Sequence, residues 1–170
     1  MTVTHNGVGF DQPKARARML VHGIPPHSPF KEVDTLKAAR KYFEFTSNSL
    51  EDLCRQLGLT MKGKPGFHTW LECMAGDPKA WHRMKTYNKN DVVILEQLYE
   101  RLLPWINNHP NMGLLSDRPD ACPKCGVEGR MIVRGRNPAR VTFRVQYQCQ
   151  ACRGYCSGRA IKKSDVRYVP

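Results

Sequence analysis

The stretch YNKNDVVILEQLYERLL, residues 87–103, carries the pattern that decides the fold of this chain. Its leucines at positions 95, 98 and 102 recur at helical spacing, which predicts an amphipathic helix with a buried apolar stripe. Tyr87 and Asp91 are four residues apart, so a helix places the phenol and the carboxylate on one face, about one turn apart. Such a carboxylate can hold a divalent metal ion while the phenol orients a water molecule. The alternative is that both are solvated helix residues.

The composition is that of an ordinary soluble protein with one medium domain and one small domain. Hydrophobic residues make up 41% of the 170 residues, and the mean hydropathy is −0.54. No apolar run approaches the length that spans a membrane, and the first residues lack the basic-then-apolar order of a signal peptide. We therefore expect a cytoplasmic protein with no membrane partner.

The first residues predict a strand, a tight turn and a helix. Met1–Thr4 is typical of the end of a short strand, and HNGVGFD, residues 5–11, is typical of the turn that leaves it. The two glycines of this turn let the backbone bend sharply. Asp11 then precedes a predicted helix that runs through Leu20. A role for Asp11 as the N-cap of that helix is compatible with metal binding.

Further helices are predicted up to residue 106. Ser49 is the expected N-cap of a helix that Gly58 closes, and Asp77 is the expected cap of a later one. Seven residues of this region are expected to pack in the core: Cys54, Trp70, Leu71, Cys73, Met74, Trp81 and Met84. Residues 1–106 are thus predicted to form one helix-rich α/β domain, and residues 107–120 a linker.

Two Cys-x2-Cys pairs define a small C-terminal domain at residues 121–170. Cys122 and Cys125 form the first pair, Cys149 and Cys152 form the second, and 23 residues separate the pairs. Two thiolates on a tight turn converge on one ion, and a second such turn completes a tetrahedron. The spacing therefore predicts a zinc ribbon with four cysteine ligands.

The segment between the two pairs predicts a β-hairpin. Residues 130–134 and 141–147 alternate apolar and polar side chains like strands, and residues 135–138 are the expected turn. Because a segment of this size cannot build a sufficient apolar core, zinc is expected to supply much of its folding energy. Four cysteine ligands leave no open coordination position, which predicts a structural ion. Cys156 is then spare or an occasional substitute ligand.

Positive charge is concentrated at the C-terminal end. Residues 118–170 carry twelve Lys or Arg and three acidic side chains, a net charge of +9, whereas residues 1–117 carry a net charge of +3. A basic tail on a near-neutral body favours nucleic acid as partner over a merely solubilising role. The candidate contact residues are Lys62 and Lys64 in a basic loop, and Arg134, Arg136, Arg140 and Arg144 on the ribbon, where Tyr147 and Tyr155 lie among the arginines. A solvated loop and a protein-binding ribbon are the alternatives.

In the order and spacing of its motifs, the chain resembles the DnaQ-like (RNase H-like) 3′–5′ exonucleases of the DEDDy type, which have a tyrosine in the last motif. NGVGFD, residues 6–11, is similar to the second exonuclease motif, and Tyr87-x3-Asp91 is similar to the third. Val33–Leu36 and the helix after Ser49 match the connecting region. With a zinc ribbon appended, the arrangement is similar to exonuclease-like proteins of bacteriophages, so the cytoplasm would be that of a host bacterium.

The resemblance implies hydrolysis of phosphodiester bonds by two metal ions, on DNA rather than RNA. It makes Asp11 and Asp91 ligands of Mg²⁺ or Mn²⁺, and Tyr87 the group that orients the attacking water. Asn6 would shape the turn or touch the substrate. The first motif of the family, Asp-x-Glu, does not occur in this sequence.

The predicted function is therefore a 3′–5′ exonuclease-like module that is incomplete alone. Three explanations for the missing motif stay open: the chain is a fragment, a partner chain supplies the front half, or it is a remnant retained for binding. The alternative function is a catalytically silent nucleic-acid-binding zinc-ribbon protein. A protein-interaction adaptor that docks through the ribbon is a third possibility.

Overall fold

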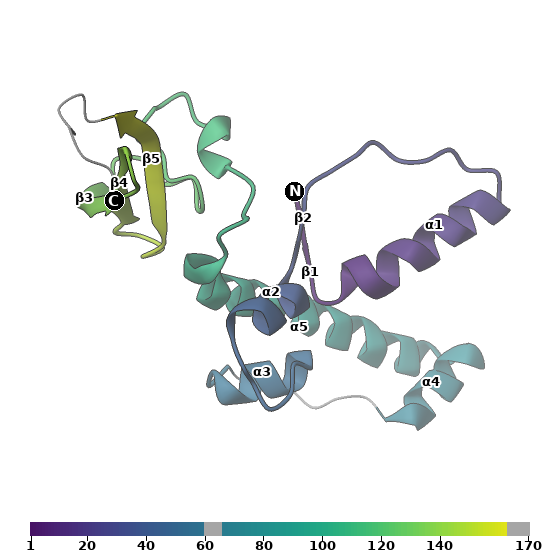
Figure 1. The fold of residues 1–170 in the computed structure, drawn as a ribbon. Coiled ribbons are helices and arrows are strands. Elements are labelled where there is room, and N and C mark those ends of the chain that lie inside the picture. Colours follow the sequence, from purple (N-terminus) through teal and green to yellow (C-terminus); the bar gives the residue numbers. More distant parts are fainter. Residues whose placement is uncertain (60–65, 163–170) are drawn as a thin grey trace. The chain divides into compact units, whose positions relative to one another are not determined.

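The computed structural model describes residues 1–59 and 66–162 (Figure 1). The chain divides into two compact units, Met1–Leu102 and Leu103–Pro170, each with its own secondary structure. The fold class is the predicted one, a helix-rich α/β unit followed by a small antiparallel sheet. Lys62 and Lys64 lie outside the described residues. Within the described part of the chain, no helix combines the length and apolar character needed to cross a membrane.

The first unit begins with two short parallel strands. β1 (Thr2–Thr4) pairs with β2 (Glu32–Asp34), and Val3 lies opposite Val33. Parallel strands need a crossover connection, and residues 5–31 supply it with α1 (Gln12–Val21). The predicted first strand and the helix after Asp11 are therefore confirmed.

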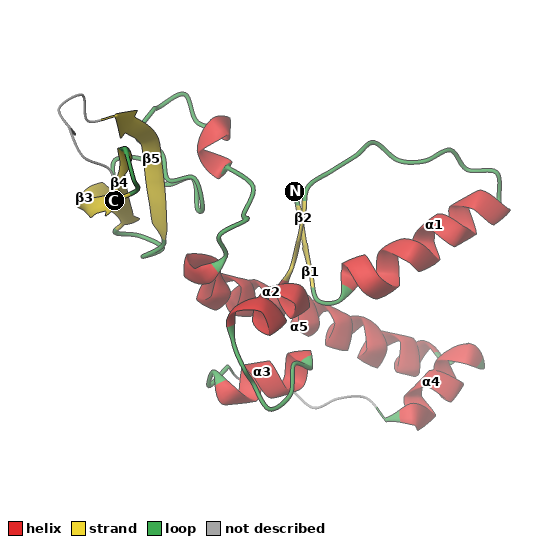
Figure 2. Ribbon diagram, in the orientation of Figure 1, coloured by secondary structure: helices red, strands yellow, loops and turns green. Residues whose placement is uncertain are grey.

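In the described residues of this unit, four α-helices follow α1 (Figure 2). They are α2 (Thr35–Tyr42), α3 (Leu50–Gln56), α4 (Phe67–Met74) and α5 (Pro78–Leu102). The Ser49 hydroxyl accepts a hydrogen bond from the Asp52 amide at 3.2 Å at the start of α3. The Asp77 carboxylate accepts one from the Lys79 amide at 2.9 Å at the start of α5. Both predicted caps are confirmed, because capping depends on residues that are neighbours in sequence.

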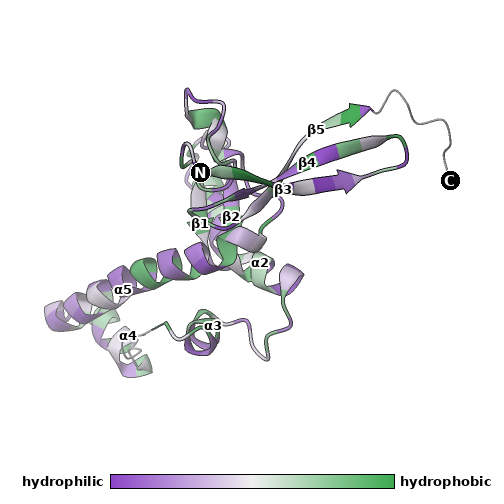
Figure 3. Cartoon of the chain, turned by 90° about the vertical axis from the view of Figure 1, so that its left-hand side faces the viewer, coloured by the Kyte–Doolittle hydropathy of each residue, from purple (hydrophilic) through white to green (hydrophobic). Residues whose placement is uncertain are grey.

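The long helix α5 organises the first unit, since α2, α3 and α4 each pack against it. Hydrophobic and hydrophilic residues alternate along α5, as an amphipathic helix requires (Figure 3). Its buried side chains near the C-terminal end are Ile94, Leu98 and Leu102, whereas Leu95 is only half-buried. The predicted apolar stripe is confirmed, with Ile94 in the place expected for Leu95.

The predicted core role of the apolar residues around the α4–α5 corner is mostly wrong. Exposure is 56% for Trp70, 49% for Leu71, 84% for Met74 and 46% for Trp81, whereas Met84 is buried. Only Cys73, Ala80 and Met84 form a buried cluster there, with Tyr87 packed against it. Helical periodicity identifies an apolar face, but α4 is only two turns long and covers a narrow strip of α5. Cys54 and Cys73 are buried, as predicted.

The second unit contains the antiparallel sheet β3 (Met131–Pro138), β4 (Thr142–Cys149) and β5 (Tyr155–Lys162), in the order β3-β4-β5. The turn predicted at residues 135–138 is wrong, because β3 continues through Pro138. The strand passes a bulge between Val133 and Gly135, and the Ala139 amide closes the actual turn on the Thr142 carbonyl at 2.8 Å. Arg134 is the extra residue of the bulge, and Gly135, predicted as a turn residue, pairs with Gln146 of β4.

The segment predicted as a linker, residues 107–120, contains the 3-10 turn Met112–Leu115. The Met112 amide donates to the Pro123 carbonyl at 2.8 Å, and a Cβ on Gly113 would lie 2.9 Å from the Ala121 carbonyl oxygen. This turn therefore packs directly against the segment that carries the first cysteine pair.

Candidate functional site

Asp34, at the end of β2, organises the turn that follows β1. Its side chain is 7% exposed and accepts four backbone hydrogen bonds. Oδ1 accepts from the amides of Asn6 at 2.9 Å, Leu36 at 3.0 Å and Lys37 at 3.4 Å, and Oδ2 accepts from Val8 at 3.3 Å. One carboxylate thus caps α2 and ties the turn to β2. Sequence reasoning missed this role, although an Asp directly before a helix is a preferred N-cap.

The turn itself is a single π-helical turn, Gly7–Asp11, entered through a left-handed residue. Asn6 has φ 67° and ψ 16°, and its carbonyl accepts the Phe10 amide at 2.9 Å. Asp11 ends the turn, is exposed, and makes no side-chain capping bond to α1. The capping role considered for Asp11 is therefore not observed, and its carboxylate is presented to solvent.

Gly7→Ala is expected to destabilise the first unit by about 1–3 kcal/mol, in the usual range for overpacking. A Cβ at position 7 would lie 2.6 Å from both Cβ and Oγ1 of Thr4, and that hydroxyl donates to Glu32 Oε1 at 2.8 Å. Urea unfolding followed by tryptophan fluorescence measures the change. In the matched variant Gly66→Ala nothing lies within 4 Å of the new Cβ, so a smaller loss is expected. Equal losses in the two variants would contradict the steric explanation.

His5 fixes the other side of this turn. Its Nδ1 lies 2.9 Å from Thr35 Oγ1, and its Nε2 lies 3.1 Å from the carbonyl oxygen of Asn48. Burial lowers the pKa of His5, and the hydrogen bond to Asn48 opposes that effect without reversing it. The imidazole is therefore neutral at pH 7 and holds the turn against the segment before α3.

Tyr87 and Asp91 lie together on α5, as their spacing predicted. The Tyr87 hydroxyl makes a side-chain hydrogen bond with Asp91. Burial raises the pKa of Tyr87, and the charge of Asp91 and this hydrogen bond raise it further. The phenol is therefore protonated at neutral pH and donates to the carboxylate. Burial and the Asp91 charge also raise the pKa of Cys54, which places that α3 thiol near the pair.

A divalent metal site of the kind implied by the resemblance is not assembled by the described residues. Among residues 1–59 and 66–162, one group of three or more His, Cys or acidic side chains is close enough to share an ion, and it consists of four cysteines. Asp11 and Asp91 do not belong to such a group. These two carboxylates alone do not fit a two-metal centre for Mg²⁺ or Mn²⁺.

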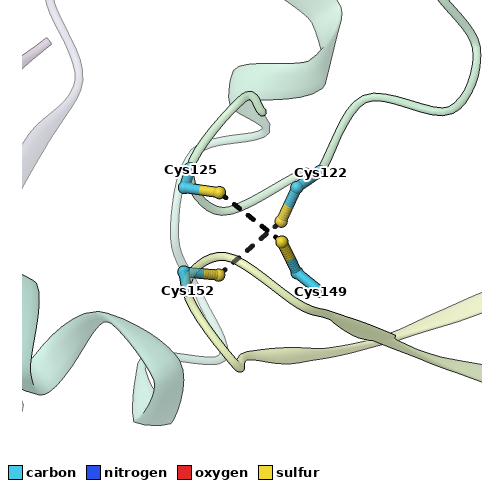
Figure 4. A group of neighbouring side chains, drawn as sticks. All are labelled: Cys122, Cys125, Cys149 and Cys152. Atoms are coloured by element: carbon cyan, nitrogen blue, oxygen red, sulfur yellow. Dashed lines mark hydrogen bonds between the residues drawn. The ribbon is translucent and has the colours of Figure 1, made fainter. Parts of the chain in front are cut away.

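The four cysteines Cys122, Cys125, Cys149 and Cys152 converge at one point (Figure 4). All four sulfur atoms lie within 4.8 Å of one another. The sulfurs of Cys122 and Cys152 are 3.8 Å apart, as are those of Cys125 and Cys149. A tetrahedral ion with zinc–sulfur bonds of about 2.3 Å requires sulfur–sulfur edges of about 3.8 Å. The donor set and its spacing therefore fit a closed Zn²⁺ site.

Backbone amides around the first cysteine pair favour a thiolate. Burial opposes ionisation of Cys122, but hydrogen bonds from the Cys125 and Lys124 amides and from neighbouring thiols outweigh it, so the pKa of Cys122 is lowered. Burial raises the pKa of Cys125 and of Cys152. A bound cation reverses this effect of burial on the thiol pKa values, because a coordinated thiol is deprotonated outright.

The two knuckles use the same backbone conformation with different residues. Gly126, after the first pair, has φ 76°, and Arg153, after the second pair, has φ 62°. The Gly126 amide donates to the Cys122 carbonyl at 2.8 Å, and the Arg153 amide donates to the Cys149 carbonyl at 2.9 Å. In the second knuckle an arginine thus takes the left-handed conformation that a glycine takes in the first.

The arginines considered for nucleic-acid contact all lie exposed on the β3–β4 hairpin. Arg134 Nε donates to Gln148 Oε1 at 2.9 Å, and Arg144 Nη1 donates to the Gly158 carbonyl at 3.4 Å. The Arg136 guanidinium lies over the Phe143 ring, 4.9 Å from its centroid. Arg140 lies in the turn between the strands. The sheet therefore displays four guanidinium groups, three of them held by local contacts.

Comparison with known proteins assigns the first unit to a superfamily. The short parallel strands, the crossover helix and the helices packed on α5 form a mixed α/β unit. The model of the RNase H superfamily matches residues 1–103, so the chain belongs to that superfamily. No curated protein and no solved structure gives a significant match to the chain.

Proposed function

We propose that this chain is a nuclease module that removes nucleotides from the 3′ ends of DNA, with a zinc ribbon that contacts the substrate. The observation that carries the proposal is the Tyr87–Asp91 pair, a protonated phenol hydrogen-bonded to a carboxylate on α5. Membership of a superfamily of nucleases supports it. RNase H-like nucleases use divalent metal ions, which would supply the Lewis-acid chemistry of phosphodiester hydrolysis.

Each of the residues named by the resemblance has a defined task in this proposal. Asp91 and Asp11 are the candidate metal ligands, and Tyr87 orients the attacking water through its hydroxyl. Asn6 shapes the turn that presents Asp11, since its left-handed backbone allows the π-helical turn to form. Among the described residues no acidic group of three is close enough to share an ion, so further ligands would come from a partner chain or from residues outside the described ranges.

The ribbon is proposed to bind substrate and not to catalyse. Four cysteine ligands would close the coordination sphere of Zn²⁺, so no position is left for a water or a phosphate. The arginines of the β3–β4 hairpin, with the net charge of +9 on residues 118–170, suit a phosphate backbone. Such contacts position a strand without reading its sequence.

The test is Mn²⁺-dependent digestion of 5′-labelled single-stranded DNA by the purified chain. Because Asp11 and Asp91 alone do not make a two-metal centre, a ladder of products shortened from the 3′ end is expected only where the chain, alone or as an oligomer, completes the site. Asp91→Asn is then expected to reduce the rate by about 100-fold or more, the scale of losing a group that acts on the transition state. The matched control is Glu96→Gln, which removes the same charge from an exposed position on the same helix. A ladder that persists in Asp91→Asn would exclude the assigned site.

The second candidate is a catalytically silent nucleic-acid-binding protein. It is favoured by the absence of a three-carboxylate group among the described residues. In that case no ladder forms, but the oligonucleotide still binds, and its affinity falls steeply with salt because bound counterions are released. Affinity that is independent of salt, or absent at low salt, would exclude this candidate.

A further inference from the structure

The second unit contains a pocket of about 500 Å³ beside the cysteine cluster. This volume lies within the range of small-molecule sites. Its polar and aromatic lining comes from the segment before the first knuckle, from that knuckle and from two strands: Asn107, His109, Lys124, Gln146, Tyr155 and Ser157. None of the residues that line it is an aspartate or a glutamate.

One wall of the pocket comes from β4 and β5, which contribute Gln146, Tyr155, Cys156 and Ser157. Gln146 of β4 lies opposite Ser157 of β5, and Gln148 lies opposite Tyr155. Side chains two apart on a strand share a face, so these four project from the same side of the sheet. Tyr155 is 52% exposed, so its ring is accessible at the edge of the pocket. The wall therefore offers an aromatic surface flanked by an amide and a hydroxyl.

The charge of the pocket comes from Lys124, whose side chain is 6% exposed. Its Nζ donates to the Pro104 carbonyl at 2.5 Å. Its aliphatic stem passes over Gly154, where a Cβ would come within 2.6 Å of Lys124 Cδ. Burial lowers the pKa of His109, and the Lys124 charge lowers it further, so His109 is neutral at pH 7. The pocket is thus positively charged through one anchored ammonium.

A second cation, Arg134, lies on the same face of the sheet as Tyr155. Arg134 Nε donates to Gln148 Oε1 at 2.9 Å, and Gln148 Nε2 donates to the Arg153 carbonyl at 3.1 Å. Gln148 is the cross-strand neighbour of Tyr155. Arg134 of β3 and Tyr155 of β5 therefore lie on either side of Gln148, on the same face of the sheet.

We propose that this pocket receives one base of a single-stranded nucleic acid, stacked on Tyr155 and hydrogen-bonded by Gln146, with the flanking phosphates toward Lys124 and Arg134. Stacking on an aromatic ring and nearby cations are the two features that single-strand binding requires. A site for phosphate alone would not need the ring or the amide. The identity of the ligand rests on the proposed nucleic-acid-directed function, but base binding does not require cleavage.

The test measures binding and not cleavage, so the two proposals can fail separately. Fluorescein-labelled dT10 and an all-abasic strand of the same length are titrated with the zinc-loaded full chain, without added Mg²⁺ or Mn²⁺, by fluorescence anisotropy. Tyr155→Ala is expected to weaken dT10 binding about tenfold, the scale of one lost base stack. Tyr155→Phe keeps the ring and is expected to change the affinity less than twofold.

A second pair of variants controls for effects of misfolding on the measured affinity. Gln146→Glu puts a carboxylate into the pocket and is expected to weaken dT10 binding, whereas Gln150→Glu makes the same charge change at an exposed site outside it. Zinc content is measured for every variant. The proposal is overturned if the abasic strand binds as tightly as dT10, if Tyr155→Ala and Tyr155→Phe behave alike, or if dT10 does not bind at low salt.

Discussion

Cys149→Ser is expected to release the metal ion and to unfold the sheet β3–β5 while leaving the first unit folded. Cys149 is fully buried, and its sulfur lies 3.8 Å from that of Cys125. Structural zinc sites contribute about 10–16 kcal/mol of apparent binding free energy in small domains. That amount equals or exceeds the total stability of about 5–15 kcal/mol of an ordinary domain. A three-ligand remnant therefore cannot maintain the ribbon.

The measurement is metal content by mass spectrometry together with amide NMR spectra. The wild-type chain is expected to hold one Zn²⁺, and Cys149→Ser is expected to hold none and to lose the dispersed ribbon signals. Cys156→Ser is the matched control, because Cys156 is a half-buried thiol on β5 outside the group of four. A zinc content of one in Cys149→Ser, or a loss of zinc in Cys156→Ser, would refute the assignment of the ligands.

Asp34→Ala is expected to destabilise the first unit by on the order of 3 kcal/mol, from a lost helix cap and buried amides left without an acceptor. The carboxylate accepts the amides of Asn6 and Val8 from the turn and those of Leu36 and Lys37 from α2. Removing it frees the turn that presents Asp11 as well as the start of the helix. The proposed nuclease activity is therefore expected to fall together with the stability of the first unit.

Two other variants distinguish the role of the buried Asp34 carboxylate from that of an ordinary helix cap. Asp34→Asn keeps an oxygen that can take the place of Oδ1, which accepts three of the four amides, so a smaller loss is expected. Asp77→Ala removes the half-buried cap of α5 and is expected to cost about 1 kcal/mol. Urea unfolding monitored by circular dichroism gives all three values. If Asp34→Ala costs no more than Asp77→Ala, Asp34 does not hold the turn.

Features that depend on neighbours in sequence were predictable. Ser49 and Asp77 cap the helices that they were predicted to cap, because a cap joins residues two or three apart in the sequence. The convergence of the four cysteines was predictable for a similar reason, since each Cys-x2-Cys turn directs two thiols to one side. The hydrogen-bonded Tyr87–Asp91 pair followed from the spacing of one helical turn.

Features that depend on which surfaces meet were not predictable. Trp70, Met74 and Trp81 have the spacing of core residues, yet they are exposed, because the neighbouring elements in the described structure do not cover that face. The hairpin turn lies after Pro138 and not at Gly135, because the residues from Gly135 to Pro138 pair with β4 after a bulge at Arg134. Neither outcome can be obtained from a local pattern.

The sequence by itself determined the α/β character of the first unit, its helix caps, the apolar stripe of the long helix and the grouping of the four cysteines, because each rests on spacing between near neighbours in the chain. Only the tertiary structure decided that Asp34 holds the Asn6 turn, and that Lys124, Gln146 and Tyr155 line one pocket. These arrangements join residues that are 22 to 31 positions apart or lie on different strands, so they exist only when the chain has folded.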